Sequence, residues 1–491
     1  MSVLIVVNKP RNWPLKISGC EVVAARDYLT DPKYYRLRGA RVFNLCRTYR
    51  YQSTGYYVSL LATARGHKPL PSIETIQDIK TAAIIRLASD ELDELIQNSL
   101  KHIHSHEFTL SIYFGRNVAK RYDKLAGYIF RLFQCPLMRA NFVHTEDEGW
   151  QLRSLRVISA NEIPETHHPF VIELATDYFR RYRAGTTWRT QSRYDIAILH
   201  STTESDPPSN ERALNKFIKA ARELDMDAEL LEKDDYGSLP QYDALFIRET
   251  TLVDHHTYRW SRRAFAEGMV VIDDPDSIVK CGNKVYLTEL LDLHRVRIPK
   301  TLIVHKANVE DIIPKIGLPC ILKKPDSSFS LGVYKAADEA SLHDKVEELL
   351  SESDLVLAQE FLPTPYDWRV GILDGKPLYV CRYYMAENHW QIQRTDQVGK
   401  KHYGKVDTLP VSEAPAQVVS TALRAAKLIG NGFYGVDLKE SGRRTYVIEV
   451  NDNPSVEAGF EDRVLKDELY LKVMEVFLRR LEKLTEARPE K

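Results

Sequence analysis

The clearest alternation of hydrophobic and polar residues lies near the end of the chain, in two short runs separated by a turn. Residues 435–439 alternate, residues 445–451 alternate, and Ser441-Gly442 between them is typical of a turn. Because successive side chains of a strand point to opposite faces, we expect Val436, Leu438, Ile448 and Val450 to share one face. The pattern predicts a β-hairpin that turns near Arg443 and buries one face.

The other face of this hairpin carries oxygen-bearing side chains. Glu449 and Asn451 point the same way, and the pairing places Asp437 opposite Glu449. Carboxylate and amide oxygens suit hard cations such as Mg2+, usually together with substrate phosphates. Solvated strand residues would produce the same alternation. The apolar residues of the opposite face, and Asn453-Pro454 just beyond the strand, favour a metal site.

Apolar segments elsewhere predict strands and helices in alternation, which is typical of α/β domains. The first third has predicted strands at residues 4–7, 21–24, 41–44, 108–114 and 152–158, and predicted helices at 56–66, 75–88, 90–99 and 118–134. The middle has predicted strands at 194–199, 228–231, 244–247 and 270–272, and helices at 210–223 and 257–267. The last part has predicted strands at 319–324, 355–361 and 378–384, and helices at 277–291, 416–429 and 465–484.

Length and composition indicate an ordinary globular protein of several domains. A chain of 491 residues with 44% hydrophobic and 28% charged residues is too long for one core. We expect an N-terminal domain at residues 1–188, a second domain at 189–300 and a third at 301–491. Lysine plus arginine and aspartate plus glutamate both number 68, so net charge gives no argument for nucleic-acid or membrane binding.

The cysteines and the N-terminus favour a cytoplasmic protein. The six cysteines are scattered without a CxxC pair, as in a reduced protein rather than a disulfide framework or zinc site. The short apolar run at the N-terminus is typical of a first strand and not of a signal peptide. No run approaches the length of a transmembrane helix.

A run of arginines, tyrosines and small hydroxyl residues occupies residues 44–57 and continues at residues 64–69. Ser53, Thr54 or Gly55 can cap the following helix, whose free N–H groups favour an anion. An edge that binds phosphate or carboxylate and a capped helix with surface arginines explain this run equally well.

Two further polar clusters also have alternative explanations. His102, His104 and His106 alternate, which on a strand would gather them as a metal site, but an exposed polar edge is favoured because carboxylate partners are missing. Residues 248–250 follow a predicted strand end, where α/β proteins place ligands. A plain loop explains residues 248–250 at least as well.

Basic residues and a loop of small residues mark the last two fifths of the chain. A predicted helix carries Lys284, and a predicted strand ends in Lys323 and Lys324. The loop that follows, residues 325–333, contains small hydroxyl residues and Gly332, so its backbone N–H groups can fold over phosphates. A single glycine makes this signal weaker than a Walker-type loop.

In chain order these features resemble the ATP-grasp fold, and within it the RimK-type carboxylate–amine ligases. The residues that carry the resemblance are Lys284, Lys323, Gln359-Glu360-Phe361-Leu362, Asp367-x-Arg369, Arg382, Asp437 and Glu449-Val-Asn451-x-Asn453-Pro454. The resemblance covers residues 190–475, and the first third resembles the N-terminal extension of a subset of RimK-like proteins. The expected fold is therefore a multidomain α/β chain with an N-terminal extension, a pre-ATP-grasp βαβ layer and an α+β ATP-grasp domain.

The loop supports one choice within this resemblance and departs from the family in one respect. Lys323 matches the strand lysine of the family better than Lys324, because Gly332 then falls nine positions on. Phe329 and Ser330 stand where glutamine or glycine is common in the family. The resemblance still implies a nucleotide at this loop.

The resemblance implies ATP as cofactor, with Mg2+ or alternatively Mn2+. The residues implied for ATP are Lys284, Lys323, Ser327, Ser328, Ser330, Gly332, Gln359, Glu360, Phe361, Leu362 and Asp367. The metal ligands implied are Asp437, Glu449 and Asn451, with Asn453 facing the substrate side. Arg382 and Arg394 would stabilise the reacting phosphate and oxyanion, and Arg369 would orient substrate or pair with Asp367.

The reaction implied is amide formation driven by ATP. A small-molecule, peptide or protein-tail carboxylate would become an acyl phosphate, and an amine such as an amino acid would displace phosphate, leaving ADP. A kinase with the same fold, or a nucleotide-binding regulatory protein, is the alternative. A homo-oligomer stays open.

Overall fold

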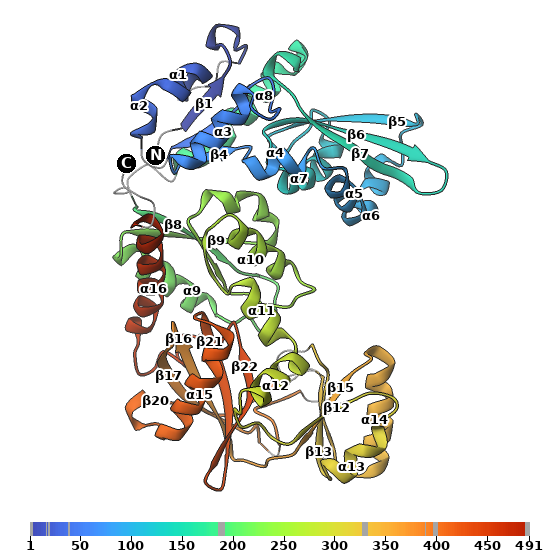
Figure 1. Ribbon diagram of the computed structural model, residues 1–491, viewed down its shortest axis with the longest axis vertical. Coiled ribbons are helices and arrows are strands. Elements are labelled where there is room, and N and C mark those ends of the chain that lie inside the picture. Colours follow the sequence, from blue (N-terminus) through green and yellow to red (C-terminus); the bar gives the residue numbers. More distant parts are fainter. Residues whose placement is uncertain are drawn as a thin grey trace. The chain divides into compact units, whose positions relative to one another are not determined.

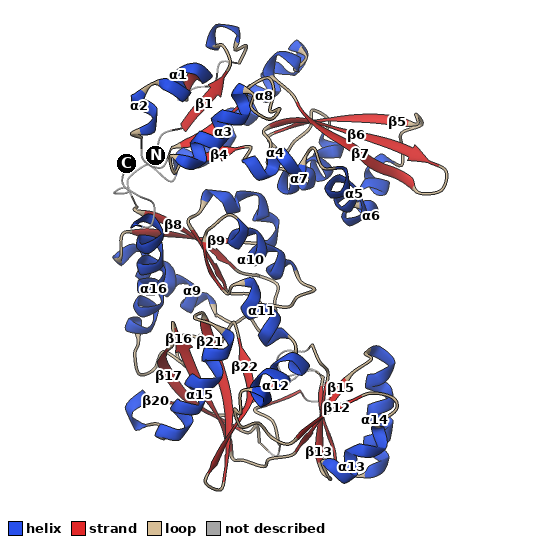
Figure 2. Cartoon of the chain, viewed as in Figure 1, coloured by secondary structure: helices blue, strands red, loops and turns tan. Residues whose placement is uncertain are grey.

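The computed structural model describes residues 3–15, 17, 20–37, 40–184, 192–326, 332–387, 389–395 and 401–486. It divides into two compact units, which are described separately. The N-terminal unit comprises residues 1–191 and 235–241, and the C-terminal unit comprises residues 192–234 and 242–491. Both units combine helices with sheets (Figure 2), so the predicted α/β class is confirmed.

The N-terminal unit contains a parallel sheet and an antiparallel sheet. The parallel sheet has the order β2-β1-β3-β4, from β1 (Val3–Val7), β2 (Glu21–Ala24), β3 (Arg41–Asn44) and β4 (Lys68–Leu70). Its strands alternate with α1 (Ala25–Thr30), α2 (Pro32–Tyr35), α3 (Thr54–Ala64) and α4 (Ile73–Asp78). The antiparallel sheet consists of β5 (Glu107–Tyr113), β6 (Leu137–Thr145) and β7 (Gly149–Val157). Its helices are α5 (Ala82–Glu91), α6 (Asp93–Leu100) and α7 (Asp123–Leu132), followed by α8 (His168–Ala184) (Figure 1).

One predicted helix of this unit is divided in two. The helix expected at residues 75–88 ends at Asp78, and α5 starts at Ala82. The amide N–H groups of Lys80 and Thr81 each donate to the carbonyl three residues earlier, which tightens the chain into a turn. Hydrophobic periodicity continues through this turn, so the pattern alone could not reveal it.

The polar run of the N-terminal unit has partly structural roles. Ser53 caps α3 by accepting from the Tyr56 amide at 3.3 Å, as predicted. Arg65 donates to the carbonyl oxygens of Tyr28 and Leu29, which favours the structural explanation for this arginine. The three alternating histidines of the sequence precede β5 rather than lying on a strand. All three are exposed, and among the described residues they form no group that could hold a metal ion.

The C-terminal unit has three main sheets. The first is parallel, in the order β11-β10-β8-β9, from β8 (Tyr194–Leu199), β9 (Met226–Leu231), β10 (Ala244–Ile247) and β11 (Val270–Ile272). The second is antiparallel, in the order β12-β15-β13-β14, from β12 (Thr301–Val304), β13 (Cys320–Lys323), β14 (Val333–Ala336) and β15 (Val356–Glu360). The third has the order β20-β17-β16-β21-β22, from β16 (Tyr366–Leu373), β17 (Lys376–Tyr384), β20 (Val406–Leu409), β21 (Phe433–Ser441) and β22 (Arg444–Asn451). A small ladder joins β18 (Gln393–Thr395) to β19 (Lys401–Tyr403).

Helices cover these sheets and connect them. They are α9 (Glu211–Glu223), α10 (His256–Ala266), α11 (Pro275–Gly282), α12 (Lys284–Leu293), α13 (Ile312–Lys315), α14 (Glu339–Glu352), α15 (Ala416–Ile429) and α16 (Asp467–Glu486). The helix expected at residues 277–291 is two helices, because the Asn283 side chain caps α12 by accepting from two amides. No helix within the described ranges has both the length and the apolar character needed to cross a bilayer.

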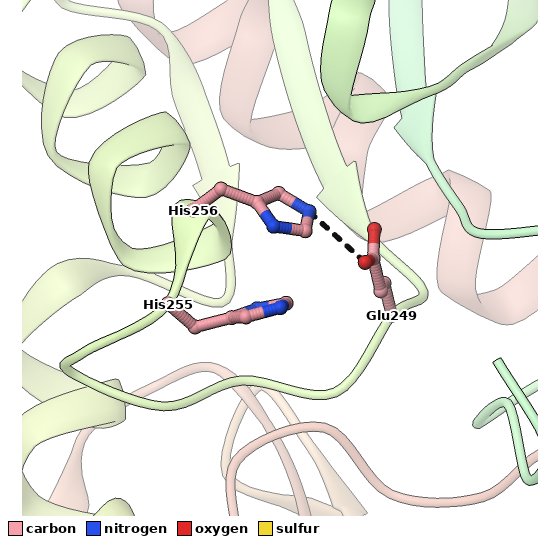
Figure 3. Close-up of side chains that lie close together, drawn as sticks. All are labelled: Glu249, His255 and His256. Atoms are coloured by element: carbon pink, nitrogen blue, oxygen red, sulfur yellow. Dashed lines mark ion pairs between the residues drawn. The ribbon is translucent and has the colours of Figure 1, made fainter. Parts of the chain in front are cut away.

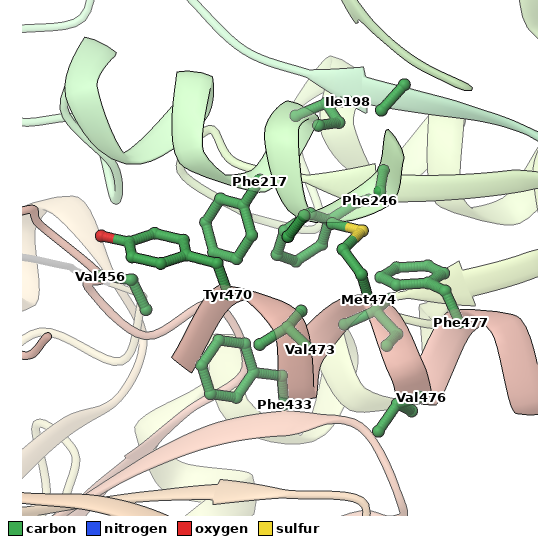
Figure 4. Packing of buried hydrophobic residues seen from close by; sticks show 14 of the residues in the cluster. Ile198, Phe217, Phe246, Phe433, Val456, Tyr470, Val473, Met474, Val476 and Phe477 are labelled. Atoms are coloured by element: carbon green, nitrogen blue, oxygen red, sulfur yellow. The ribbon is translucent and has the colours of Figure 1, made fainter. Parts of the chain in front are cut away.

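The helix α16 joins the parallel sheet to the five-stranded sheet. Its buried face carries Tyr470, Met474 and Phe477, which belong to one hydrophobic core with Phe217 of α9 and Phe246 of β10 (Figure 4). The same core includes residues of β17 and β21. The C-terminal helix α16 therefore packs both against the parallel sheet and against the five-stranded sheet that carries the predicted metal ligands.

Candidate active site

The hairpin predicted from the sequence is formed by β21 and β22 with the expected register. Asp437 lies opposite Glu449, and Asn451 lies opposite Gly435. Gly442 adopts a positive φ of 63° in the turn, a conformation that glycine takes without strain. The opposite face, with Val436 and Val450, is fully buried in a core shared with α15. The ladder shifts its register between Asp437 and Leu438, so that Val447 is buried and Ile448, which was expected on the buried face, is only half-buried.

Arg369 holds Asp437 through two hydrogen bonds. Its Nε and Nη2 donate to the two carboxylate oxygens at 2.6 and 2.7 Å, because Arg369 of β16 lies directly opposite Asp437 of β21. Asp367 pairs instead with Lys439, at 2.5 Å. The expected alternative in which Arg369 pairs with Asp367 is therefore wrong. Residues 367 and 369 share one strand face, and each finds its partner across the sheet.

Two buried lysines approach the second carboxylate. Lys284, at the start of α12, places its Nζ 2.9 Å from Glu449 Oε1. Burial alone would raise the pKa of Glu449, but Lys284, with help from Lys323 and Arg369, lowers it below its ordinary value. Burial lowers the pKa of Lys323 to about 8, against the opposing pull of Glu449. Two cations beside one carboxylate leave a positive site that suits a polyanion.

These groups line one cavity of about 610 Å³ in the C-terminal unit. Its lining includes the predicted residues Lys284, Lys323, Gln359, Glu360, Phe361, Leu362, Asp367, Arg369, Asp437, Glu449 and Asn451. Part of the wall is apolar and includes Ile321, Val333 and Ile448. The rings of Phe361 and Trp390 also line it, in an edge-to-face arrangement with their centroids 6.1 Å apart. The cavity thus combines an apolar slot with a charged end.

The end of β15 is held by β12. The backbone N–H of Glu360 donates to the Lys300 carbonyl at 2.9 Å, and its carboxylate accepts from the Lys300 amide at 2.8 Å. The Gln359 side chain donates to Thr301 Oγ1 at 2.9 Å. Both side chains serve the strand pairing, so the backbone beyond β15 is what this segment offers to a ligand.

Arg382 does not join the other predicted residues. It lies opposite Trp368 in the ladder, on the other sheet face from Arg369, and its guanidinium lies over the rings of Tyr366 and Trp368 at 5.2 and 4.7 Å. Arg382 is not among the residues that line the cavity. Its expected catalytic role is therefore not supported. The position of Arg382 among the motifs of the sequence did not reveal which face of β17 it occupies.

The remaining predicted site residues belong to the loop after β13 and to β18. Ser327, Ser328 and Ser330 lie outside the described residues, as does the side chain of Arg394, whose backbone belongs to β18. Gly332 has a positive φ of 76°, and its carbonyl accepts from the Lys324 amide at 2.9 Å. Gly332 therefore closes the loop onto the strand, next to Val333 of the cavity wall.

Arg248 does not line the cavity but supports a segment that does, a role the sequence did not reveal. Its buried guanidinium donates to Asn453 Oδ1 at 2.7 Å and to the carbonyl oxygens of Pro208 and Pro454 at 2.7 and 2.8 Å. The Asn453 Nδ2 donates to the Glu249 carbonyl at 2.6 Å. Asn453 lines the cavity, but its amide is engaged at both ends. Its contribution is to anchor the segment after β22.

Asp452 was also missed. It lines the cavity beside Asn451, and burial raises the pKa of its carboxyl to about 7. Its place between Asn451 and Asn453 could have indicated a site residue. Strict alternation, however, points its side chain away from the face of Glu449 and Asn451.

The donor set of the hairpin fits Mg2+. Asp437, Glu449 and Asn451 offer two carboxylates and an amide oxygen, which are ligands that hard cations prefer. Asp437 and Glu449 are direct cross-strand neighbours. The two β-layers with a cavity between them, two buried lysines and this oxygen set define the class: an ATP-grasp protein.

Comparisons with known proteins identify the family. The model described as the RimK-like ATPgrasp N-terminal domain matches residues 25–174, and the model described as the RimK-like ATP-grasp domain matches residues 281–475. The chain belongs to the RimK-like ATP-grasp family and carries its N-terminal domain. The family and fold predicted from the sequence are confirmed.

The curated relatives are ligases. Proteins named alpha-aminoadipate–LysW ligase LysX from Sulfolobus acidocaldarius and Saccharolobus solfataricus are 30% identical over 192 and 195 residues, which are 38% of this chain and 66% and 67% of theirs. The match thus covers about two thirds of the length of each of these relatives, and slightly less than two thirds of the Sulfolobus acidocaldarius protein. A probable alpha-L-glutamate ligase from Vibrio vulnificus is 24% identical over 47% of this chain and 74% of its own. Among solved structures, D-alanine–D-alanine ligase from Bacillus anthracis aligns with a TM-score of 0.47 and 15% identity, over 60% of this chain and 99% of that chain.

Proposed function

We propose that this protein is an ADP-forming carboxylate–amine ligase that makes an amide bond through an acyl phosphate. The observation that carries the proposal is the meeting of Lys284 and Lys323 with Asp437, Glu449 and Asn451 in one cavity. A site with two cations and a set of oxygen ligands matches the needs of a nucleotide triphosphate with its metal ion. ATP-grasp ligases as a family use ATP and Mg2+.

Each group has a proposed task. Lys284 and Lys323 hold phosphate oxygens as point charges, and Lys284 exchanges Glu449 for phosphate when ATP binds. Asp437, Glu449 and Asn451 hold Mg2+, which supplies charge neutralisation for phosphoryl transfer. Arg369 positions Asp437 by its two hydrogen bonds.

The apolar slot suits adenine. Phe361 and Trp390 offer ring surfaces, and the backbone at Glu360 and Leu362 supplies the polar contacts of the purine edge. Asp367 is proposed at the ribose. Water is excluded on this side by Ile321 and its apolar neighbours.

One substrate is proposed to be an amino acid, acting as the amine, and the other a carboxylate of a peptide, a protein tail or a small acid. Support comes from the names of the relatives, which place alpha-aminoadipate with LysW and glutamate as ligation substrates of those proteins. We retain three functional parts, namely an extension at residues 1–188, a pre-grasp layer at 189–300 and a grasp domain at 301–491. A cytoplasmic location is also part of the proposal.

The proposal is tested by ADP release. The full chain with MgATP is incubated with a panel of amino acids and carboxylates, and products are identified by mass spectrometry. We expect an amide together with ADP and phosphate, and a loss of at least a hundredfold in turnover for Lys284→Ala. Lys315→Ala, which removes an exposed lysine that pairs with Asp311 four residues earlier, is the matched control. A stable phosphate ester as product would instead establish a kinase and refute the ligase.

A further inference from the structure

A cluster of two histidines and a glutamate lies outside the nucleotide site, in the parallel-sheet layer of the C-terminal unit. Glu249 follows the end of β10, His255 precedes α10, and His256 is its first residue. One candidate ligand atom from each of the three side chains lies within 4.8 Å of the others. Figure 3 shows the carboxylate and both rings turned toward the same space. Within the described residues this is the one such group of three or more.

The carboxylate of this cluster is incompletely satisfied. Glu249 is 5% exposed, and its Oε2 is buried without a hydrogen-bond partner among the described residues. Its Oε1 lies 2.9 Å from His256 Nε2, yet the angle at this contact is not that of a hydrogen bond. A buried carboxylate oxygen without a partner costs free energy, which a bound cation would recover.

The second histidine is oriented as metal-binding histidines are. His255 Nδ1 lies 3.0 Å from Thr257 Oγ1, and that hydroxyl donates to the Thr250 carbonyl at 3.2 Å. With the hydroxyl proton on the Thr250 carbonyl, the hydroxyl oxygen pairs with the His255 tautomer that carries its proton on Nδ1. This tautomer leaves the lone pair on Nε2, and a hydrogen bond from the other ring nitrogen is the usual support of a ligating histidine.

We propose that Glu249, His255 and His256 bind one divalent transition-metal ion of the zinc type. Two imidazole nitrogens and one carboxylate oxygen match the preference of Zn2+ and its neighbours in the first transition row. Mg2+ prefers oxygen ligands and waters, so this site and the hairpin site select different ions. Three protein ligands leave a coordination position for water or another small ligand.

The site has a structural link to the cavity. Thr250, Thr251 and Leu252 line the cavity and directly follow Glu249 in the chain. The Glu249 carbonyl accepts from Asn453, which also lines the cavity. A metal ion bound by Glu249 and the start of α10 therefore closes the loop of residues 249–256 at both ends and fixes this part of the cavity wall.

The proposal is tested on the full chain by metal binding, without reference to turnover. Metal-free protein is titrated with Zn2+ by calorimetry in the presence of excess Mg2+, and with Co2+ by visible absorption. We expect one tightly bound Zn2+ per chain and a Co2+ spectrum with nitrogen ligation. The double variant His255→Ala/His256→Ala should lose that ion, and Glu249→Gln should weaken its binding at least tenfold.

Two controls make the outcome decisive. His104→Ala/His106→Ala removes the same number of imidazoles from the turn before β5 and should keep the ion. Glu449→Gln changes the hairpin site and should also keep the ion, which separates this proposal from the ligase proposal. Zn2+ binding that is absent in the unaltered chain, or unchanged in a His255→Ala/His256→Ala variant with a native circular dichroism spectrum, would overturn it. If that variant does not fold, retention of the ion by Glu249→Gln at full affinity would overturn it instead.

Discussion

Lys323 and Arg382 illustrate what single residues contribute to the site. Both were predicted from their place in the order of motifs, yet only Lys323 lines the cavity. Lys323 ends a short buried strand, so its direction follows from the strand. Arg382 sits within a strand whose two faces are both occupied by large side chains, and the sequence does not say which face is the ligand side. The partner of Arg369 was unpredictable for a related reason, because β16 and β21 are far apart in the chain.

Nucleotide binding should take up a proton above neutral pH. The pKa of Lys323 is lowered by burial to about 8, and phosphate oxygens nearby would raise it again. At pH 8, where about half of the unliganded chains carry neutral Lys323, binding of ATP should take up a fraction of a proton, and at pH 6 none. The uptake is measured by calorimetry in two buffers of different ionisation enthalpy. An equal uptake by Lys323→Met would show that another group is responsible.

Removal of the Arg248 guanidinium should strongly destabilise the C-terminal unit. Arg248→Met keeps much of the volume but leaves two carbonyls and Asn453 without their donor, for an expected loss of about 3 kcal/mol or more in the free energy of unfolding. Urea unfolding measures the loss. Arg222→Met, at an exposed arginine of α9, is the control and should change the free energy by less than about 0.5 kcal/mol.

At the scale of elements, the sequence predicted what strict periodicity determines. The hairpin of β21 and β22 was predicted from its alternation, which gives the pairing of Asp437 with Glu449. The register shift beside that pair, which buries Val447 in place of Ile448, was missed. The helix α15 was predicted with its observed limits, because its apolar stripe ends at Gly430. The breaks at residues 79–81 and at Asn283 were missed, since apolar spacing continues across both. Side-chain capping and short turns can interrupt a helix without changing its hydrophobic pattern.

The turn between β16 and β17 should help to hold α16. Asp374 accepts from Arg480 at 2.7 Å and also from Arg479. Burial would raise the pKa of Asp374, but the two arginines lower it, so the stabilisation is present at neutral pH and is lost as pH falls below about 4. Asp374→Asn keeps a residue that tolerates the positive φ of 49° and should cost up to about 1 kcal/mol, less at high salt.

Hydrogen exchange of residues 467–486 measures this effect. Exchange in the Asp374→Asn variant should accelerate in α16 at pH 7, and its difference from the unaltered chain should shrink as the pH falls below about 4. A difference that does not shrink at all as the pH is lowered would mean that the aspartate acts through the turn conformation and not through its charge.

At the scale of the whole molecule, the two units have separate cores. Among the described residues, each of these hydrophobic clusters draws on one unit only: three on the N-terminal unit and three on the C-terminal unit. The cavity in which we propose that the nucleotide binds is lined by residues of the C-terminal unit. Ligand binding should therefore stabilise one unit directly.

Calorimetric unfolding should show this as two transitions, of which MgADP moves one. At a ligand concentration a hundred times the dissociation constant, the gain is about 2.7 kcal/mol for the unit that binds. Lys284→Ala should abolish the shift and leave the other transition unchanged. A parallel shift of both transitions would show that the units unfold together.

The anchoring of Asn453 by Arg248 bears on how such enzymes can be recombined. The segment that follows the proposed metal ligands is held to the parallel-sheet layer by two hydrogen bonds from Arg248, to Asn453 and Pro454, and the same guanidinium also binds Ser209 and Pro208 within that layer. A chimaera that takes its grasp domain from one relative and its preceding layer from another must therefore carry Arg248 and Asn453 as a matched pair. Exchange at the domain boundary alone would leave Asn451, two residues away, without the support that sets its position.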